Sequence, residues 1–469
     1  MASTTYLTRT PSSAGNRKTF TFSAWIKGQT RNPAGTTGGT LFSCGTDTGS
    51  GPLFIIDFLN GQNIRVEDTI TGGSQPIDIR TNRVFRDVNA WYHIVIAVDT
   101  TQGTASDRVK IYVNGVQETS LSATTYPGQN IDTSVNNTHV HIIGGRAAGL
   151  TNKYFDGSMS HIHFVDGTAY PASTFGSTDA TTGEWKINTS PSVTYGTNGF
   201  WILKDGNSVT DQSGNSNNFT VAGGTLTKTE DNPSNVFCTW NPLNYDFANN
   251  PSTFAKGNTQ VTPTQTTAYN TGVSTLAMPK GNGKFYTEIK YISSGNVNGG
   301  FGIVDMDYVN KIYYENYNLM EETTATTIGR VIYGKNGAVV TGGGVETGGF
   351  GGTWSNGDII GIACDMENGA IYFSKNGTWQ NSGDPTSGVS RTGAVNTSAA
   401  SWWTGTSQWG LWCGKKVSTT DLSFQANFGN GYFNTTAVSS AGTNASNNGI
   451  FEYDVPSGYT ALSTKGLNL

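Results

Sequence analysis

Short runs of alternating apolar and polar residues, separated by Gly and Asn, recur along almost the whole chain. Residues 19–26 put Phe20, Phe22, Ala24 and Ile26 on one face of an extended strand and Trp25 on the other. Asn114-Gly115 follows a similar run. This pair favours a hairpin turn, because Asn and Gly readily adopt the positive φ values that such a turn needs. Long stretches with helical spacing of apolar residues are missing. The pattern therefore predicts an all-β protein.

The predicted strands form two series that are not copies of each other. They cover residues 19–26, 93–98, 109–113, 285–292, 301–304, 358–365, 370–375 and 422–428. We predict two tandem antiparallel β-sandwiches, with a first domain over residues 1–190 and a second over 237–469. Residues 191–236 are expected to bridge them and to add strands.

Charge and hydropathy exclude several classes of protein. The 469 residues include 28 Lys and Arg and 33 Asp and Glu, with a net charge of -5 and no basic stripe, which argues against nucleic-acid binding. No apolar run reaches the about 18 residues of a membrane span, so no membrane insertion is expected. The first residues lack the pattern of a secretory signal. Four widely spaced cysteines predict reduced, buried thiols.

The first domain resembles the laminin-G-like group of the concanavalin A-like lectin superfamily. The matching segments are residues 20–27, 91–95, 109–115, 143–145 and 155–159. Residues 211–219 resemble a turn usually found near the start of such domains, and here they follow the sandwich. That order predicts a rearranged or partial set of strands.

The second domain resembles a SPRY domain, a β-sandwich used mostly for protein recognition. Residues 283–289 match its first strand, 357–377 its middle and 424–429 its closing strand. The resemblance implies a binding module. We expect no cofactor, unless calcium binds the cluster of oxygen ligands described below.

The whole chain resembles tail or surface proteins of bacteriophage particles, through residues 8–18, 164–176 and 235–243. This implies a protein made in the host cytoplasm and placed on the exterior of the virion. Its implied partners are other virion proteins and a host-surface glycan or protein receptor. Virion symmetry implies a homo-oligomer, such as a trimer, by analogy.

Three functions follow as hypotheses. The first is a non-enzymatic tail fibre or adhesin, and the second is a capsid decoration or head-fibre protein. The second gains weight because the first strand begins almost at the N-terminus, without a tail-docking segment. The third is a polysaccharide depolymerase. Enzymes of this superfamily often carry a Glu-x-Asp-x-x-Glu segment, and none is found here, so we expect no enzyme activity. Glu67 has no partner at that offset, although another pair could converge in space.

Aromatic residues are the candidate ligand-binding groups, because flat rings stack on sugars or anchor protein interfaces. The candidates are Tyr313, Tyr314, Tyr317, Trp402 and Trp403. An extended backbone would keep Trp402 and Trp403 from both pointing inward, whereas Trp409 and Trp412 are expected in the core.

Two clusters are candidate metal ligands. His139 with His141, and His161 with His163, would each share one face of a strand, either to hold a metal or as part of an outer sheet face. Calcium is common in related lectins, and Asp205, Asn207, Asp211 and Asn215 are the densest group of oxygen ligands. An Asn/Asp/Gly turn without an ion explains the same residues.

Overall fold

A computed structural model describes most of the chain. Described are residues 4–28, 39–46, 51–59, 62–146, 153–204, 206, 208–243, 252–263, 270–295, 299–308, 329–342, 346–397, 400–404, 408–415 and 421–468. The chain divides into two compact units, Met1–Lys228 and Thr229–Leu469. The fold is all-β, and within the described residues α-helix is limited to α2 (Ser401–Thr404).

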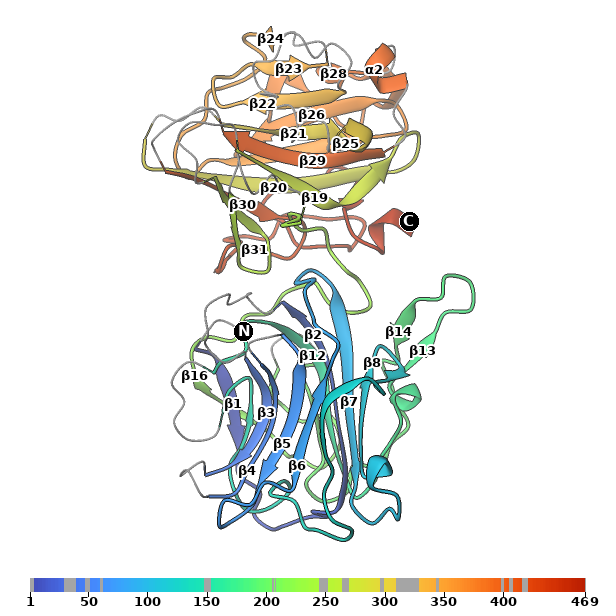
Figure 1. Cartoon of the computed structure of the whole chain (residues 1–469). Coiled ribbons are helices and arrows are strands. Elements are labelled where there is room, and N and C mark those ends of the chain that lie inside the picture. The colour runs from blue at the N-terminus through green and yellow to red at the C-terminus, as the bar shows by residue number, and fades with distance from the viewer. Residues whose placement is uncertain are drawn as a thin grey trace. The chain divides into compact units, whose positions relative to one another are not determined.

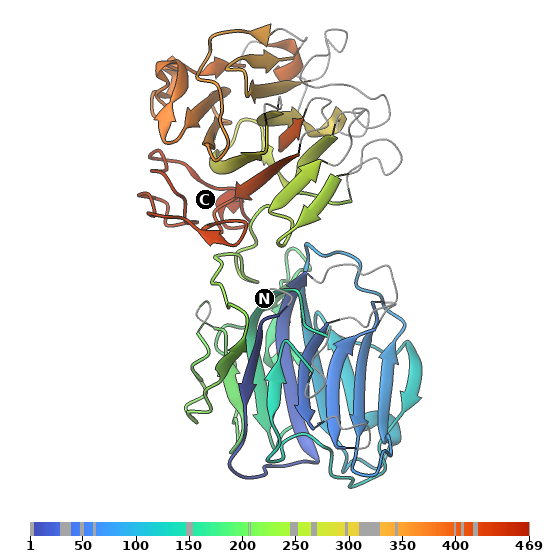
Figure 2. The same ribbon diagram turned by 90° about the vertical axis from the view of Figure 1, so that its left-hand side faces the viewer.

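The first unit is a sandwich of two antiparallel sheets, which Figures 1 and 2 show from two sides. The eight-stranded sheet has the order β10 (Leu121–Thr125), β6 (Ile77–Thr81), β5 (Ile64–Thr69), β4 (Leu53–Phe58), β3 (Thr40–Gly45), β11 (His141–Ile143), β1 (Tyr6–Arg9), β16 (Thr220–Gly223). The six-stranded sheet has the order β15 (Phe200–Ile202), β12 (Gly157–Asp166), β2 (Thr19–Gly28), β7 (Trp91–Asp99), β8 (Val109–Val113), β9 (Val116–Gln117).

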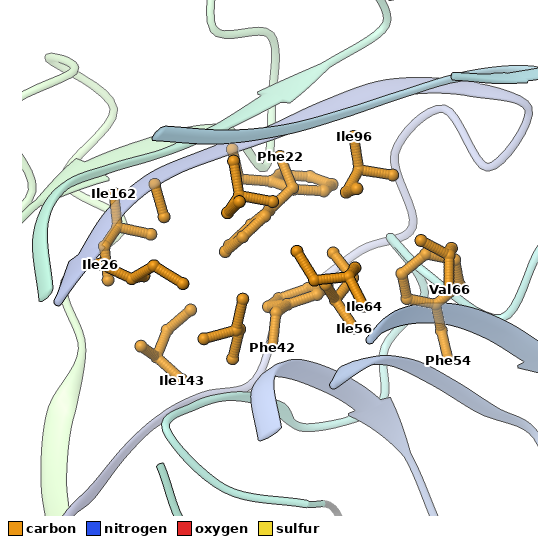
Figure 3. Packing of buried hydrophobic residues seen from close by; sticks show 14 of the residues in the cluster. Phe22, Ile26, Phe42, Phe54, Ile56, Ile64, Val66, Ile96, Ile143 and Ile162 are labelled. Carbon is orange, nitrogen blue, oxygen red and sulfur yellow. The ribbon is translucent and has the colours of Figure 1, made fainter. Parts of the chain in front are cut away.

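The core of the first unit lies between these sheets. Figure 3 shows Phe22, Ile96 and Ile162 of the six-stranded sheet facing Phe42 and Ile64 of the eight-stranded sheet. The prediction for residues 19–26 is confirmed, because their alternate side chains are buried in this core and Trp25 lies on the opposite face against His93. The expected turn after β8 is also confirmed, with φ of 47° at Asn114 and 83° at Gly115.

The stretch after β12 adds to this unit. β15 pairs with β12, and β16 pairs with β1 at the edge of the other sheet. Residues 167–199, here called the first cover, also lie against the outer face of the six-stranded sheet. They contain the hairpin of β13 (Gly176–Thr178) and β14 (Trp185–Ile187), and they bury an outer cluster that includes Val95 and Phe175.

The second unit is a second sandwich. One sheet has the order β17 (Ser252–Ala255), β18 (Gln260–Pro263), β30 (Leu422–Asn427), β20 (Lys284–Ser293), β25 (Ile359–Asp365), β26 (Ala370–Lys375), β27 (Thr378–Trp379), with β28 (Val395–Asn396) and β33 (Thr460–Ala461) beside β26 and β20. The other has the order β19 (Asn270–Pro279), β29 (Gln408–Lys415), β21 (Gly299–Asp305), β22 (Arg330–Gly334), β23 (Val339–Thr341), β24 (Glu346–Thr347). A small hairpin pairs β31 (Tyr432–Phe433) with β32 (Thr436–Ala437).

The second unit also carries a cover. Residues 428–463, here called the second cover, place Phe451, Val455 and Tyr459 over the outer face of the nine-stranded sheet, where they pack with Tyr286 and Tyr372. Short 3-10 turns complete the fold, at Ala105–Asp107, Ala172–Thr174, Met306–Tyr308, Gln380–Ser382, Gly388–Ser390 and Gly466–Asn468.

Candidate ligand-binding face

The outer face of the eight-stranded sheet carries a compact group of charged side chains. Along β4, Phe54 and Ile56 enter the core, so Asp57 points to the outer face. Arg65 of β5 lies opposite Asp57, and Arg80 of β6 lies opposite Arg65. Glu67 and Asp78 form the next row of the same face. Strand register thus gathers residues from three strands, and we call this group the charged face: Asp57, Arg65, Glu67, Asp78 and Arg80.

Hydrogen bonds fix the geometry of the charged face. The Arg65 guanidinium donates to both carboxylate oxygens of Asp57, from Nε at 2.9 Å and from Nη2 at 2.7 Å, and its Nη1 pairs with Glu67. Arg80 binds Asp78 in the same two-pronged way, with both distances at 2.7 Å. The Arg80 side chain is 38 % exposed and that of Asp57 is fully buried. The β6 end of the charged face is therefore the accessible end.

Burial and charge act in opposite directions on these groups. Burial raises the pKa of Glu67, and the nearby Arg65 charge partly opposes that rise. Burial alone would lower the pKa of Arg65, but its hydrogen bond to Asp57 and the charge of that residue raise it overall. The two carboxylates share one guanidinium, so the group is an ion-pair network with fixed donors and acceptors.

Two tyrosine rings lie near the other side of this network. Tyr6 and Tyr154 stack with ring centroids 5.8 Å apart, and both rings are half-buried. Gly145 lies against both residues, and the charge of the next residue, Arg146, lowers the pKa of Glu67. Planar charged groups beside aromatic rings can bind the hydroxyls and apolar faces of a sugar.

The sequence contains a pattern that indicates the charged face. Arg65 with Glu67, and Asp78 with Arg80, alternate with apolar residues, which indicates charges on one face of two strands. Our expectation for Glu67 concerned a second carboxylate at a fixed offset along the chain. In the fold Glu67 pairs with Arg65 on its own strand, and Asp78 lies opposite it on the next strand.

Contrary to expectation, His139 and His141 do not share one face of a strand. His139 precedes β11, and His141 points into the sandwich, where its ring lies 5.8 Å from that of Phe42. The His141 ring donates from Nδ1 to the His139 carbonyl and accepts the Asn136 N–H at Nε2. Burial lowers the pKa of His141 to about 4, so the ring is neutral.

The second pair does share one side of the sheet. The rings of His161 and His163 both contact Trp201, at centroid distances of 6.1 and 4.9 Å. His163 Nδ1 lies 2.8 Å from the Tyr195 hydroxyl, and burial lowers the pKa of His163 well below its usual value. In the described parts of the chain, no group of three or more His, Cys, Asp or Glu residues could hold a metal ion. Metal binding by these histidines stays a prediction.

The proposed calcium cluster is described only in part, because Asp205 and Asn207 lie outside the described residues. Asp211 accepts four hydrogen bonds, from the N–H groups of Trp201, Ser213 and Asn217 and from the Ser213 hydroxyl. The side chain of Asn215 donates to two backbone carbonyls. These contacts explain both residues as the organisers of a turn.

The aromatic candidates have a different outcome. Tyr313, Tyr314, Tyr317 and the side chain of Trp402 lie outside the described residues. Residues 401–404 are helical, so the extended backbone that this expectation assumed does not occur there. Trp403 is buried and stacks on Trp409, with ring centroids 4.6 Å apart, so the structure does not support its assignment to a binding surface.

Two further expectations are confirmed. Trp409 and Trp412 are buried in the second unit, and the four cysteines are buried free thiols. Among the described residues, no helix is long and apolar enough to cross a membrane.

Residues 2–173 match the model of the concanavalin A-like lectin/glucanases superfamily. No curated protein sequence matches the chain. Residues 2–173, within the first unit, are therefore similar to the concanavalin A-like lectins.

Several solved structures are similar at low identity. Domains LG4-5 of the mouse laminin α1 chain are 8% identical, with a TM-score of 0.27 over 91% of this chain and 86% of that one. The SPRY domain of human HERC1 is 12% identical, with a TM-score of 0.29 over 40% of this chain and 96% of that one. Tailspike protein 2 of an Escherichia coli O157:H7 bacteriophage is 11% identical, with a TM-score of 0.25 over 36% of this chain and 22% of that one. These TM-scores are low, so no functional inference follows from them.

Proposed function

We propose that this chain is a non-enzymatic structural protein on the exterior of a bacteriophage particle, where it acts as a tail fibre or adhesin that contacts a host-surface glycan. The virion assignment depends on the sequence resemblance of residues 8–18, 164–176 and 235–243. The glycan assignment depends on the charged face of a lectin-like domain, and above all on the accessible Arg80–Asp78 pair.

The chemistry of the charged face favours binding over hydrolysis. A glycosidase needs one carboxyl group to donate a proton and another that is free to act as nucleophile or base. Asp57 and Glu67 are both bound to Arg65, and Asp57 is fully buried. The same fixed groups suit sugar hydroxyls, which donate to carboxylates and accept from guanidinium N–H groups.

Titration of the protein with purified surface polysaccharide of the host tests the binding site. Arg80→Ala removes the accessible guanidinium, and we expect a loss of about 1 kcal/mol, or about fivefold in Kd. Lys110→Ala is the matched control, because it also removes a cation from an ion pair with an aspartate, but on β8 of the other sheet. Equal affinities for both variants and the parent protein would contradict the site.

Adsorption and polymer length test the role. Excess free protein should slow the adsorption of the phage, and it should leave the chromatogram of the polysaccharide unchanged. A shortened polymer would show a depolymerase. Unchanged adsorption, together with antibody bound over the head, would show capsid decoration.

A further inference from the structure

The β13–β14 hairpin forms a two-stranded sheet of its own, outside the two large sheets of the first unit. Figure 1 shows it beside β7 and β8. Its turn is organised locally, because the Asp179 carboxylate accepts the N–H groups of Thr181 and Thr182 and pairs with Lys186 at 2.8 Å. Residues 180–184 are exposed. The hairpin can therefore keep its shape while its attachment to the sheet changes.

Trp185 attaches the hairpin to the six-stranded sheet. Its ring lies in a slot next to Gly115 and Gly176, where a Cβ atom on either glycine would overlap the indole. The ring is nearly parallel to His93, at 17° and a centroid distance of 6.0 Å, and its Nε1–H donates to His93 Nδ1 at 3.0 Å. His93 stacks on its other side against Trp25 at 4.9 Å.

This geometry requires one form of His93. Nδ1 accepts from Trp185, so the ring proton is on Nε2, where it is donated to the Ser23 hydroxyl at 2.9 Å. A proton on Nδ1 would place two N–H donors against each other and remove the bond to Trp185. It would also create a charge on a fully buried ring.

The groups that face His93 supply no negative charge. Ser23 and Trp25 of β2, Phe175 of the first cover and Trp185 of the hairpin are neutral. Asn114 of the turn after β8 accepts the backbone N–H of His93. The titratable group coupled to His93 is His163 of β12, whose protonation would add a second positive charge. The charged groups Asp179 and Lys186 of the hairpin pair with each other.

We propose that the β13–β14 hairpin is an acid-released latch, held closed by Trp185 on neutral His93 and opened when His93 takes up a proton. Opening exposes the stacked rings of Trp25 and His93 to solvent. This inference does not rest on the glycan-binding role of the protein.

The sign of the pH dependence follows from burial. The closed hairpin lowers the pKa of His93 to about 3, whereas an exposed imidazole titrates near about 6.5. The closed state is therefore fully favoured above the higher value and is weakened as the pH falls toward the lower one. Each pH unit below about 6.5 lowers the closed-to-open ratio about tenfold. At pH 5 the ratio is therefore about 30-fold lower than at neutral pH.

Hydrogen exchange of the full chain between pH 7.5 and 4.5, corrected for intrinsic rates, tests the latch. We expect the opening constant of residues 176–187 to rise about tenfold per pH unit below about 6.5. His93→Phe keeps a ring in the stack but cannot be protonated, so its opening constant should not change with pH. Trp185→Phe removes the N–H donor, so it should open more at every pH and keep a shallower acid dependence.

Asp179→Asn is the matched control, because it removes the charge that belongs to the hairpin itself and should keep the acid dependence of the parent protein. Each of three results would overturn the proposal. One is a flat opening constant in the parent protein. The second is the same acid dependence in His93→Phe as in the parent protein, and the third is the loss of that dependence in Asp179→Asn.

Discussion

Both units cover the apolar outer face of one sheet, but the buried titratable groups under the two covers differ. They are imidazoles in the first unit and a carboxyl group in the second. In each, one sheet of the sandwich has an apolar outer face that a later segment covers. The first cover lies on His93 and His163, which are buried and neutral. The second cover is attached to Glu288 of β20, a fully buried carboxyl group.

Glu288 collects donors from three parts of the second unit. Its oxygens accept the N–H groups of Glu452 and Tyr453 at 2.9 Å each, the Tyr286 hydroxyl at 3.0 Å and the Asn427 amide at 3.3 Å. Burial nevertheless raises the pKa of Glu288 to about 7. A buried imidazole that gains a proton loses its acceptor nitrogen and becomes charged. A buried carboxyl group becomes charged when it loses its proton, and burial disfavours that charge. We therefore expect the first cover to weaken in acid and the second cover to weaken in alkali.

The largest effect is expected from Glu288→Ala. The change leaves two backbone N–H groups, a phenol and an amide without their acceptor, and should cost about 4 kcal/mol of the unfolding free energy of the second unit. Urea unfolding measures it. Glu367→Ala is the control, because that half-exposed carboxylate lies 3.9 Å from Lys284 and its loss should change little. A cost below that of the control would show that Glu288 does not hold the cover.

The next effect is the alkaline loss of the second cover. The pKa of Glu288 is raised in the fold, so its contribution is fully present below the ordinary pKa of about 4.5 and is lost as the pH rises through about 7, by about 3 kcal/mol in total. Hydrogen exchange of residues 450–463 between pH 4.5 and 9, corrected for intrinsic rates, measures it. Glu288→Gln should abolish the dependence. Faster opening of this segment in acid would break the comparison between the covers.

The smallest effect comes from the removal of one phenol hydroxyl in each cover. Tyr459→Phe removes a buried hydroxyl that donates to the Pro385 carbonyl at 3.1 Å, at a cost of about 1.5 kcal/mol. Tyr195→Phe removes the hydroxyl beside His163 Nδ1, in a half-buried position, at a cost of about 1 kcal/mol. Urea unfolding of both variants measures the pair. If each change destabilised the other unit, the covers would not act locally.

Sequence patterns predict the strands well because alternation reports local geometry. The range 109–113 coincides with β8, and 370–375 with β26. Asn376-Gly377 has the same residue types as Asn114-Gly115 and likewise forms a turn, with φ of 48° and 78°. The alternation of residues 19–26 is enough to predict that Trp25 lies on the outer face.

The covers and the charged face could not be predicted in the same way. Alternation shows that His93 or Glu288 leaves the core side of a strand, but not that a segment far along the chain returns to bury it. The partners of Asp57 depend on the register between β4 and β5, which no local pattern contains. Trp403 is buried and belongs to a single helical turn, which the sequence pattern around it does not indicate.

Localisation on intact particles tests the central claim most directly. Gold-labelled antibodies against the first unit should bind the tails of unfixed particles of the phage whose genome encodes this chain, as seen by electron microscopy. Label over the head would support the decoration role and contradict the adhesin. Particles without label, in a lysate where the antibodies detect the free protein, would contradict a virion-surface role.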